Sequence, residues 1–290
     1  MSFPAPGRRA DAADAILFTL AVLVFCTGAA MTFSQMGAIR TAARRLAVVL
    51  PVTTVGLPVL AWLASRLVSS VALRGGILSA GLAPSEVASV ALTGLAAGDA
   101  ALAAGLLVTS TILTVLLAGP ILSIAGAHSS ASQLGLLSTL ALVVALPLIA
   151  GSAMRSFDPF GGREQSILRV LGTTSLLVLL WEVASQLHLR ASDARVLLAL
   201  LAYLAGAVIL GWLLAIGAPP AQRTAIVLPT AMRDFAVAAG IAASAFGAAA
   251  AAPLGIYGVL VLIFGTAAVY AARLRRPKPG DPGRDFSPLS

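Results

Sequence analysis

The stretch VLPTAMRDFAVAAGIAASAFG, from Val227 to Gly247, places two adjacent charges inside an otherwise apolar run. Arg233 and Asp234 stand where the surrounding residues read as the middle of a membrane helix. A charged side chain at the centre of a bilayer costs about 2.5 to 3.5 kcal/mol on insertion scales, so such residues are rare and mark functional sites. The stretch therefore predicts an interrupted membrane helix with a site at the interruption.

The composition of the whole chain indicates a membrane protein. Of its 290 residues, 59% are hydrophobic and 10% are charged, and the mean hydropathy is +0.99. A soluble domain could not cover so apolar a chain with polar surface, whereas lipid-facing helices need no such cover. The net charge of +8 comes from short basic clusters between apolar runs, which is typical of cytoplasmic loops and argues against nucleic acid as a partner. Cys26 is the single cysteine, so we expect it to be a small buried residue without a disulfide or metal role.

Apolar runs of membrane-spanning length follow one another along the chain. We expect an N-terminal tail over 1–14, a transmembrane domain over 15–276 with about nine spans, and a disordered cytoplasmic tail over 277–290. The first run resembles a signal peptide, but it continues to about Phe33 without an obvious cleavage site, so we expect it to be retained. The expected spans are 15–36, 46–65, 71–97, 99–124, 132–152, 166–187, 195–216, 221–249 and 252–272.

The arginines between the spans predict the orientation in the membrane. If the spans alternate, one side carries about twice as many arginines as the other, and the positive-inside rule makes that side cytoplasmic. We therefore expect the C-terminus inside and the N-terminus outside a bacterial-type inner membrane. The arginines on the cytoplasmic side are Arg40, Arg44, Arg45, Arg155, Arg163, Arg169, Arg223 and those of the tail.

Two of the expected spans are interrupted near the middle. The span 71–97 contains GLAPSEVAS and the span 221–249 contains VLPTAMRDF, and they are the third span from the start and the second from the end. Interrupted helices at corresponding places in two halves are typical of inverted-repeat secondary transporters. Backbone groups freed by such breaks need partners inside the membrane, so the breaks predict the site. We expect them to cross near the membrane midplane.

The residues around both breaks also resemble a known family. The stretch APSEVASVALTGLAAGDAALAAGLLVTSTILTVLLAGPIL, Ala83 to Leu122, is similar without gaps to the bile acid and sodium symporter family. The second break and the earlier GLPVLAW agree with that resemblance, which implies an all-α polytopic fold with a panel domain, a core domain and two broken crossing helices. Relative to ten-helix members of that family, the resemblance implies that the first helix is absent, and we expect about nine spans. The residues that keep the family pattern are Pro84, Ala88, Ser89, Thr93, Leu95, Gly98, Asp99, Ser110, Thr111, Thr230 and Met232.

The departures from the family pattern fall on its sodium ligands. A hard cation prefers oxygen ligands, and the resemblance places side chains that cannot supply them at most of the ligand positions. Only Ser89 remains of the first set, and Thr53 stands where the family has a glutamine. We therefore expect a transporter that is coupled to protons or uncoupled. The replaced positions are Val90, Ala103, Leu107, Pro229 and Arg233, and Asp234 stands in place of an asparagine.

The candidate site combines residues from both breaks. Glu86 and Arg233 are opposite charges at facing breaks, so we expect them to pair, because a buried charge is tolerated chiefly when it has a partner. Glu86 is the candidate proton carrier, since arginine does not release its proton at ordinary pH. The substrate and coupling residues are expected to be Ser85, Glu86, Ser89, Thr230, Met232, Arg233 and Asp234, with Thr53, Ser110 and Thr111 behind them.

Structural interpretations of the same residues stay open. Asp234 can cap the half-helix that begins near Phe235, and Ser85 or Glu86 can do the same at the other break. Arg233 can lock the crossing through a salt bridge, or it can touch the substrate or take part in coupling.

The function expected from these features is secondary active transport of a small organic anion by alternating access. No Gly-x-Ser-x-Gly, His-Glu-x-x-His or aspartate-rich motif is present, so an enzyme is not expected. We expect neither a metal nor a cofactor, and the partners are the organic anion and the lipid bilayer, with protein partners left open. A sodium-coupled bile-acid-type symporter is the alternative, and a channel or sensor is the second alternative.

Overall fold

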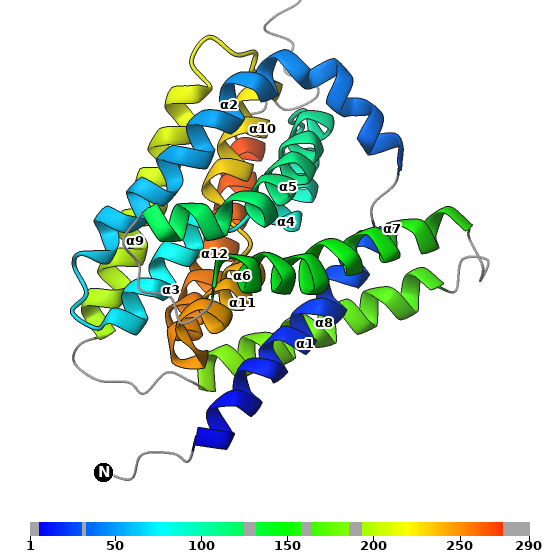
Figure 1. Ribbon diagram of the computed structural model, residues 1–290. Coiled ribbons are helices and arrows are strands. Elements are labelled where there is room, and N and C mark those ends of the chain that lie inside the picture. Colours follow the sequence, from blue (N-terminus) through cyan, green and yellow to red (C-terminus); the bar gives the residue numbers. More distant parts are fainter. Residues whose placement is uncertain (1–5, 31–32, 125–131, 158–163, 186–192, 275–290) are drawn as a thin grey trace, which may run out of the picture.

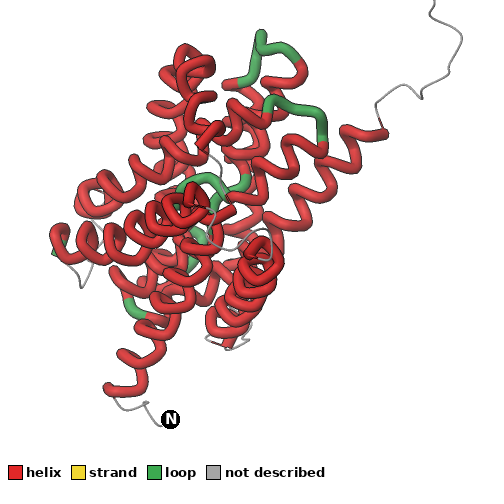
Figure 2. The backbone as a smooth tube through the Cα atoms, turned by 90° about the vertical axis from the view of Figure 1, so that its right-hand side faces the viewer, coloured by secondary structure: helices red, strands yellow, loops and turns green. Residues whose placement is uncertain are grey.

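The computed structural model describes residues 6–30, 33–124, 132–157, 164–185 and 193–274. This part of the chain consists of helices joined by short loops, some of which lie inside the helical bundle (Figure 2). In chain order the elements are α1 (Pro6–Ala30), α2 (Phe33–Ser65), α3 (Val71–Leu82), α4 (Val87–Leu95), α5 (Ala100–Ile124), α6 (Gln133–Leu140), the π-helical η1 (Ala141–Ala145), α7 (Leu146–Phe157), α8 (Glu164–Ser185), α9 (Asp193–Leu214), α10 (Pro220–Ala231), α11 (Phe235–Phe246), the 3-10 helix η2 (Ala248–Ala251) and α12 (Ala252–Leu274).

The expected spans agree with these elements apart from the first two, since α2 begins at Phe33 rather than near residue 46. The two spans predicted to be interrupted are each divided into a pair of helices, α3 with α4 and α10 with α11. Helix α1 begins at Pro6, within the expected tail over 1–14, and the extent of that tail stays a prediction. The same helix ends at Ala30 rather than near residue 36. The expected tail over 277–290 lies outside the described residues.

Six helical segments of the described chain are long and apolar enough to cross a membrane. Three shorter apolar helices, Ala13–Ala29, Val71–Leu82 and Phe235–Phe246, account for the remaining expected spans, two of them as halves of the interrupted pairs. The chain is therefore a multi-pass membrane protein, while the number nine stays a prediction. The six segments are Ala43–Ser65, Ala100–Ile124, Leu134–Arg155, Ser166–Val183, Ala194–Leu214 and Ala248–Leu274.

Helix α1 packs mainly against α7 and α8, and these three lie together at the lower right of Figure 1. Glycines allow the backbones of α1 and α7 to touch. A Cβ atom added at Gly28 would lie 2.3 Å from the Leu148 carbonyl oxygen, and one added at Gly151 would lie 2.1 Å from that of Phe25. Any larger residue at either position would push the two helices apart.

The other helices pack around the two interrupted pairs. Helix α2 contacts α3, α5 and α9, while α11 contacts α3, α12 and α1. Almost every side chain of α11 is buried, and the fully buried Tyr203 of α9 and Tyr257 of α12 are among the largest side chains of the core. The breaks between α3 and α4 and between α10 and α11 are thus enclosed by protein on several sides.

Candidate functional site

The two breaks meet and pair with each other through their backbones. Ser85 and Arg233 form an isolated antiparallel bridge. The Glu86 N–H donates to the Met232 carbonyl oxygen at 2.8 Å, and the Asp234 N–H donates to that of Pro84 at 2.9 Å. The expectation that the breaks meet is confirmed, and backbone groups lost from the helices are satisfied by the opposite break.

Local sequence explains where each break falls. Ala83 ends α3 in an extended conformation, with φ −61° and ψ 153°, because the residue before a proline is pushed out of the helical region by Pro84. At the other break, Asp234 is extended with φ −67° and ψ 101° and caps α11. Its Oδ1 accepts hydrogen bonds from the Ala236 and Val237 N–H groups, both at 2.9 Å. The prediction that Asp234 is an N-cap is confirmed.

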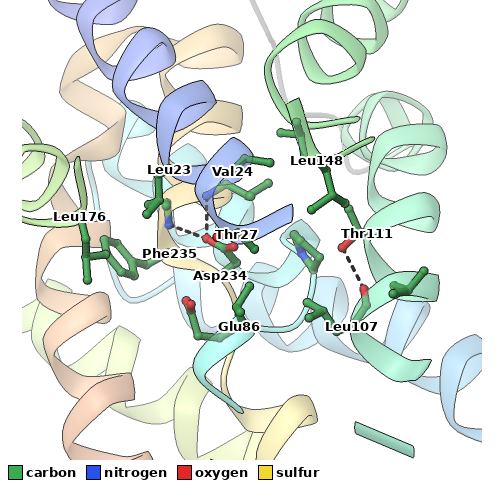
Figure 3. Close-up of a pocket in the computed structure, with 16 residues that line it drawn as sticks. Leu23, Val24, Thr27, Glu86, Leu107, Thr111, Leu148, Leu176, Asp234 and Phe235 are labelled. Atoms are coloured by element: carbon green, nitrogen blue, oxygen red, sulfur yellow. Dashed lines mark hydrogen bonds between the residues drawn. The ribbon is translucent and has the colours of Figure 1, made fainter. Parts of the chain in front are cut away.

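Extended backbone sends successive side chains to opposite faces, and this separates the charges of the crossing. Ser85 and Arg233 are directly opposite each other, so their side chains share one face. Glu86 and Asp234 lie on the other face, where both line a cavity (Figure 3). Their carboxylates are close enough to repel each other.

Arg233 is buried, with 5% of its surface exposed, and its guanidinium binds the C-terminal end of α3. Its Nη1 donates to Ser85 Oγ at 3.3 Å, and its Nη2 donates to the Ala83 carbonyl oxygen. The C-terminal end of a helix carries partial negative charge, which favours a cation there. The guanidinium therefore acts as a side-chain cap for the interrupted helix.

The predicted pair between Glu86 and Arg233 is wrong. The Nη1 and Nη2 atoms of Arg233 donate to Ser85 and Ala83, while Arg233 Nε and Glu86 Oε2 are both buried without a hydrogen-bond partner. The prediction failed by one position, because Ser85 is the residue that faces Arg233 and Glu86 points to the opposite face. Glu86 also occupies the N-cap position of α4 without a capping hydrogen bond from its side chain.

Two further carbonyls in the last turn of α3 accept hydrogen bonds from other helices. Thr114 Oγ1 of α5 donates to the Leu82 carbonyl oxygen at 2.9 Å, and the Tyr203 hydroxyl of α9 donates to that of Ala80 at 3.2 Å. Tyr257 accepts from the Arg233 N–H and donates to the Ala231 carbonyl oxygen, both at 3.3 Å. Sequence reasoning missed both tyrosines, since a lone tyrosine in an apolar run gives no signal of its partner.

The hydroxyl residues predicted behind the site lie near it on different faces. Ser110 Oγ accepts from the Ser85 N–H at 3.1 Å, so α5 directly supports the first break. Thr111 lines the cavity with Glu86 but donates to the Leu107 carbonyl oxygen of its own helix. Thr53 lines a small cavity of about 20 Å³ beside Arg233 and also donates within its own helix.

Three further predicted residues serve mainly in packing and local turns. Ser89 Oγ donates to the Glu86 carbonyl oxygen at 2.5 Å and so closes the first turn of α4. Thr230 packs against α9, since a Cβ atom added at Gly211 of α9 would lie 3.2 Å from the Cβ atom of Thr230. Met232 packs against α12, since a Cβ added at Gly265 would lie 2.7 Å from its sulfur.

The cavity at the acidic face has a volume of about 130 Å³. It lies between the crossing and α1, α5, α7 and α8, and Thr27 and Thr111 add hydroxyl groups to mostly apolar walls (Figure 3). A second cavity of about 430 Å³ shares four lining residues with it and reaches Arg155 at the end of α7. The shared residues are Leu23, Thr27, Val87 and Leu176.

Within the described part of the chain, no cluster of three or more histidine, cysteine, aspartate or glutamate residues could hold a metal ion. The polar groups at the crossing are the two carboxylates on one face and the guanidinium on the other. The carboxylate face can hold a proton or accept hydrogen bonds from a bound group, whereas the Nη atoms of the guanidinium are engaged by Ser85 and Ala83.

A multi-pass helical protein whose two buried helix breaks pair beside a cavity has the construction of a membrane transporter. The sequence model of the Sodium Bile acid symporter family matches residues 17–194, which is more than half of the chain. The chain belongs to this family, whose members are transporters and not enzymes. The match includes the first break and ends before the second. No curated protein matches the chain.

Proposed function

We propose that this chain is a secondary active transporter that moves a small organic anion by alternating access and is not coupled to sodium. In this proposal α1, the continuous segment of α6, η1 and α7, and α8 form a panel, and the remaining helices form a core around the crossing, with about nine spans related as an inverted repeat. The C-terminus is cytoplasmic, in a bacterial inner membrane. The contacts of α1 with α7 and α8 support the division into two groups.

The observation that carries the sodium-independent proposal is that carbonyl oxygens at the two breaks already accept hydrogen bonds from protein donors. The oxygens of Pro84 and Met232 accept backbone hydrogen bonds from the opposite break, and that of Ala83 accepts from Arg233. Sodium would need such oxygens, and it would also meet the fixed charge of the guanidinium. Arginine supplies at this place a cation that never dissociates.

Coupling to protons is proposed through Glu86. Its Oε2 has no hydrogen-bond partner, and its carboxylate lies beside that of Asp234 at the cavity wall. Two neighbouring carboxyl groups can reduce their repulsion by taking up one proton, which is the usual role of an acid inside a membrane transporter. Asp234 is the less available of the two, because its Oδ1 already caps α11.

Counterflow and uptake into proteoliposomes test the proposal, with sodium and proton gradients imposed separately. We expect saturable counterflow and uptake that follows the proton gradient, and Glu86→Gln should abolish the gradient effect. Asp99→Asn is a matched control, since Asp99 caps α5 away from the crossing through the Leu102 N–H.

The sodium-coupled alternative is favoured by the family itself and by the two carboxylates at the cavity, which could offset the arginine charge. Uptake that follows the sodium gradient at constant pH and survives Glu86→Gln would establish that alternative. Flux without saturation would indicate a channel, and absence of any flux would indicate a sensor.

A further inference from the structure

Arg155 projects from the last turn of α7 into the larger cavity, where the sequence predicts only a basic residue near a loop. The cavity lies between α1, α4, α7 and α8. Among the described residues, Arg155 makes one long hydrogen bond, from its Nη1 to the Ala29 carbonyl oxygen at 3.5 Å. Most of its donors have no partner among the described residues and can serve a ligand.

The walls of this cavity fit an organic anion. Its volume of about 430 Å³ lies within the range of small-ligand sites, which is about 300 to 1,000 Å³. Thr27 and Thr173 contribute hydroxyl groups, Leu168 and Leu176 are apolar, and none of the lining residues within the described part of the chain is acidic. A guanidinium binds a carboxylate or sulfonate with two parallel hydrogen bonds, so Arg155 can fix one end of such a molecule.

The charges that line the two cavities differ, and this difference indicates where an anionic group can bind. Glu86 and Asp234 line that cavity and would repel an anion, whereas Arg155 lies only in the larger one. Arg233 is excluded as an anion receptor, because it sits on the opposite face of the crossing against α3. We propose that Arg155 binds the anionic group of the substrate, with the apolar part directed along Leu23 and Leu176 toward the crossing. This inference rests on the proposed function only in calling the bound anion a substrate, since binding of an anion by Arg155 does not itself require transport.

Cys26 gives a direct test, because the only cysteine of the chain lines the same cavity. Two thiol reagents of similar size, 2-sulfonatoethyl and 2-(trimethylammonium)ethyl methanethiosulfonate, differ in charge. In each case the thiolate attacks the thiosulfonate, a mixed disulfide forms and methanesulfinate leaves. The measured quantity is the ratio of the two labelling rates, followed by mass in purified protein, with Cys26→Ser as the blank.

We expect the anionic reagent to be preferred in the natural protein, and Arg155→Gln to lower the ratio at least tenfold. Arg155→Lys should retain most of the preference, and it keeps the test decisive if the glutamine variant does not fold. Arg223→Gln is the matched control, since Arg223 likewise binds one backbone carbonyl oxygen, that of Ala218 at 3.3 Å, but does not line the cavity. Ethanesulfonate should slow labelling in the natural protein and not in Arg155→Gln.

A ratio that is the same in the natural protein and in both Arg155 variants would overturn the inference. So would a Cys26 thiol that neither reagent reaches, or ethanesulfonate protection that is independent of Arg155. Labelling does not require transport. If Arg155→Gln loses the charge preference but the natural protein shows no counterflow, the anion site is supported and the proposed transport function is contradicted.

Discussion

At the scale of single residues, Ser85 and Glu86 show how one position along an extended chain decides the partner of a buried charge. Ser85 faces Arg233, while Glu86 faces the cavity with Asp234. The residue types at both breaks indicated buried charges, and the N-cap at Asp234 could be predicted from the side chain alone. Which residue faces Arg233 could not, because it depends on the register between segments about 150 residues apart.

Arg233 and Ser85 should therefore be coupled in stability, and Arg233 and Glu86 much less. Removing the guanidinium by Arg233→Gln leaves the buried Ala83 carbonyl oxygen without its donor, which costs about 1 to 3 kcal/mol. In double-mutant cycles measured by denaturant unfolding, Arg233→Gln with Ser85→Ala should give an interaction energy of about 0.5 kcal/mol or more. A larger coupling with Glu86→Gln than with Ser85→Ala would contradict the geometry.

Asp234 is expected to stabilise the protein through its cap. Asp234→Ala removes the acceptor for two N–H groups and should lower the free energy of unfolding by about 0.5 to 2 kcal/mol. Asp234→Asn keeps an acceptor oxygen and should cost only a small part of that. Equal melting temperatures for the alanine variant and the natural protein would show that the cap contributes nothing.

At the scale of the elements, the sequence predicts where most helices and both breaks lie, but it does not predict which helices pack against each other. Pro84 and the charges at Arg233 and Asp234 mark both breaks, because proline and buried charge act locally on the helix. The packing of α1 against α7 depends instead on glycines whose partners are far away in sequence. Arg155 likewise enters the cavity only because α7 lies against α1 and α8.

Gly151→Ala should test the close contact of α1 and α7. The added Cβ would lie 2.1 Å from the backbone oxygen of Phe25, so the helices must separate, at a cost of about 1 to 3 kcal/mol. Gly94→Ala is the control within α4, where the nearest atom is 4.0 Å away. It should be neutral or stabilising, since alanine favours helix. Thermal unfolding of the two variants checks this, and equal melting temperatures would argue against the contact.

At the scale of the whole molecule, composition and the apolar runs were enough to predict a multi-pass helical protein, and the resemblance to the symporter family is confirmed by the match to its model. The two larger cavities could not be predicted, because each is formed by at least four helices that are distant in sequence. The number of spans, the inverted repeat and the division into panel and core stay predictions.

Sodium should not stabilise the purified protein. A ligand at ten times its Kd adds about 1.4 kcal/mol to the stability of the folded state, which corresponds to a rise in Tm of about 2 °C for a chain of this size. Replacing potassium chloride by sodium chloride at constant ionic strength should leave the Tm unchanged within about 1 °C. A sodium-dependent rise that Arg233→Gln does not alter would point to a sodium site elsewhere in the protein.

The backbone bonds between the two breaks also limit how the molecule can move. Each break holds the other through one N–H and one carbonyl, so neither half-helix can swing alone without exposing unpaired backbone groups in a membrane. If the chain transports as proposed, we expect the two paired breaks to move together. The cavities would then open and close by movement of α1, α7 and α8 relative to the breaks, with α1 and α7 kept together by their glycine contact.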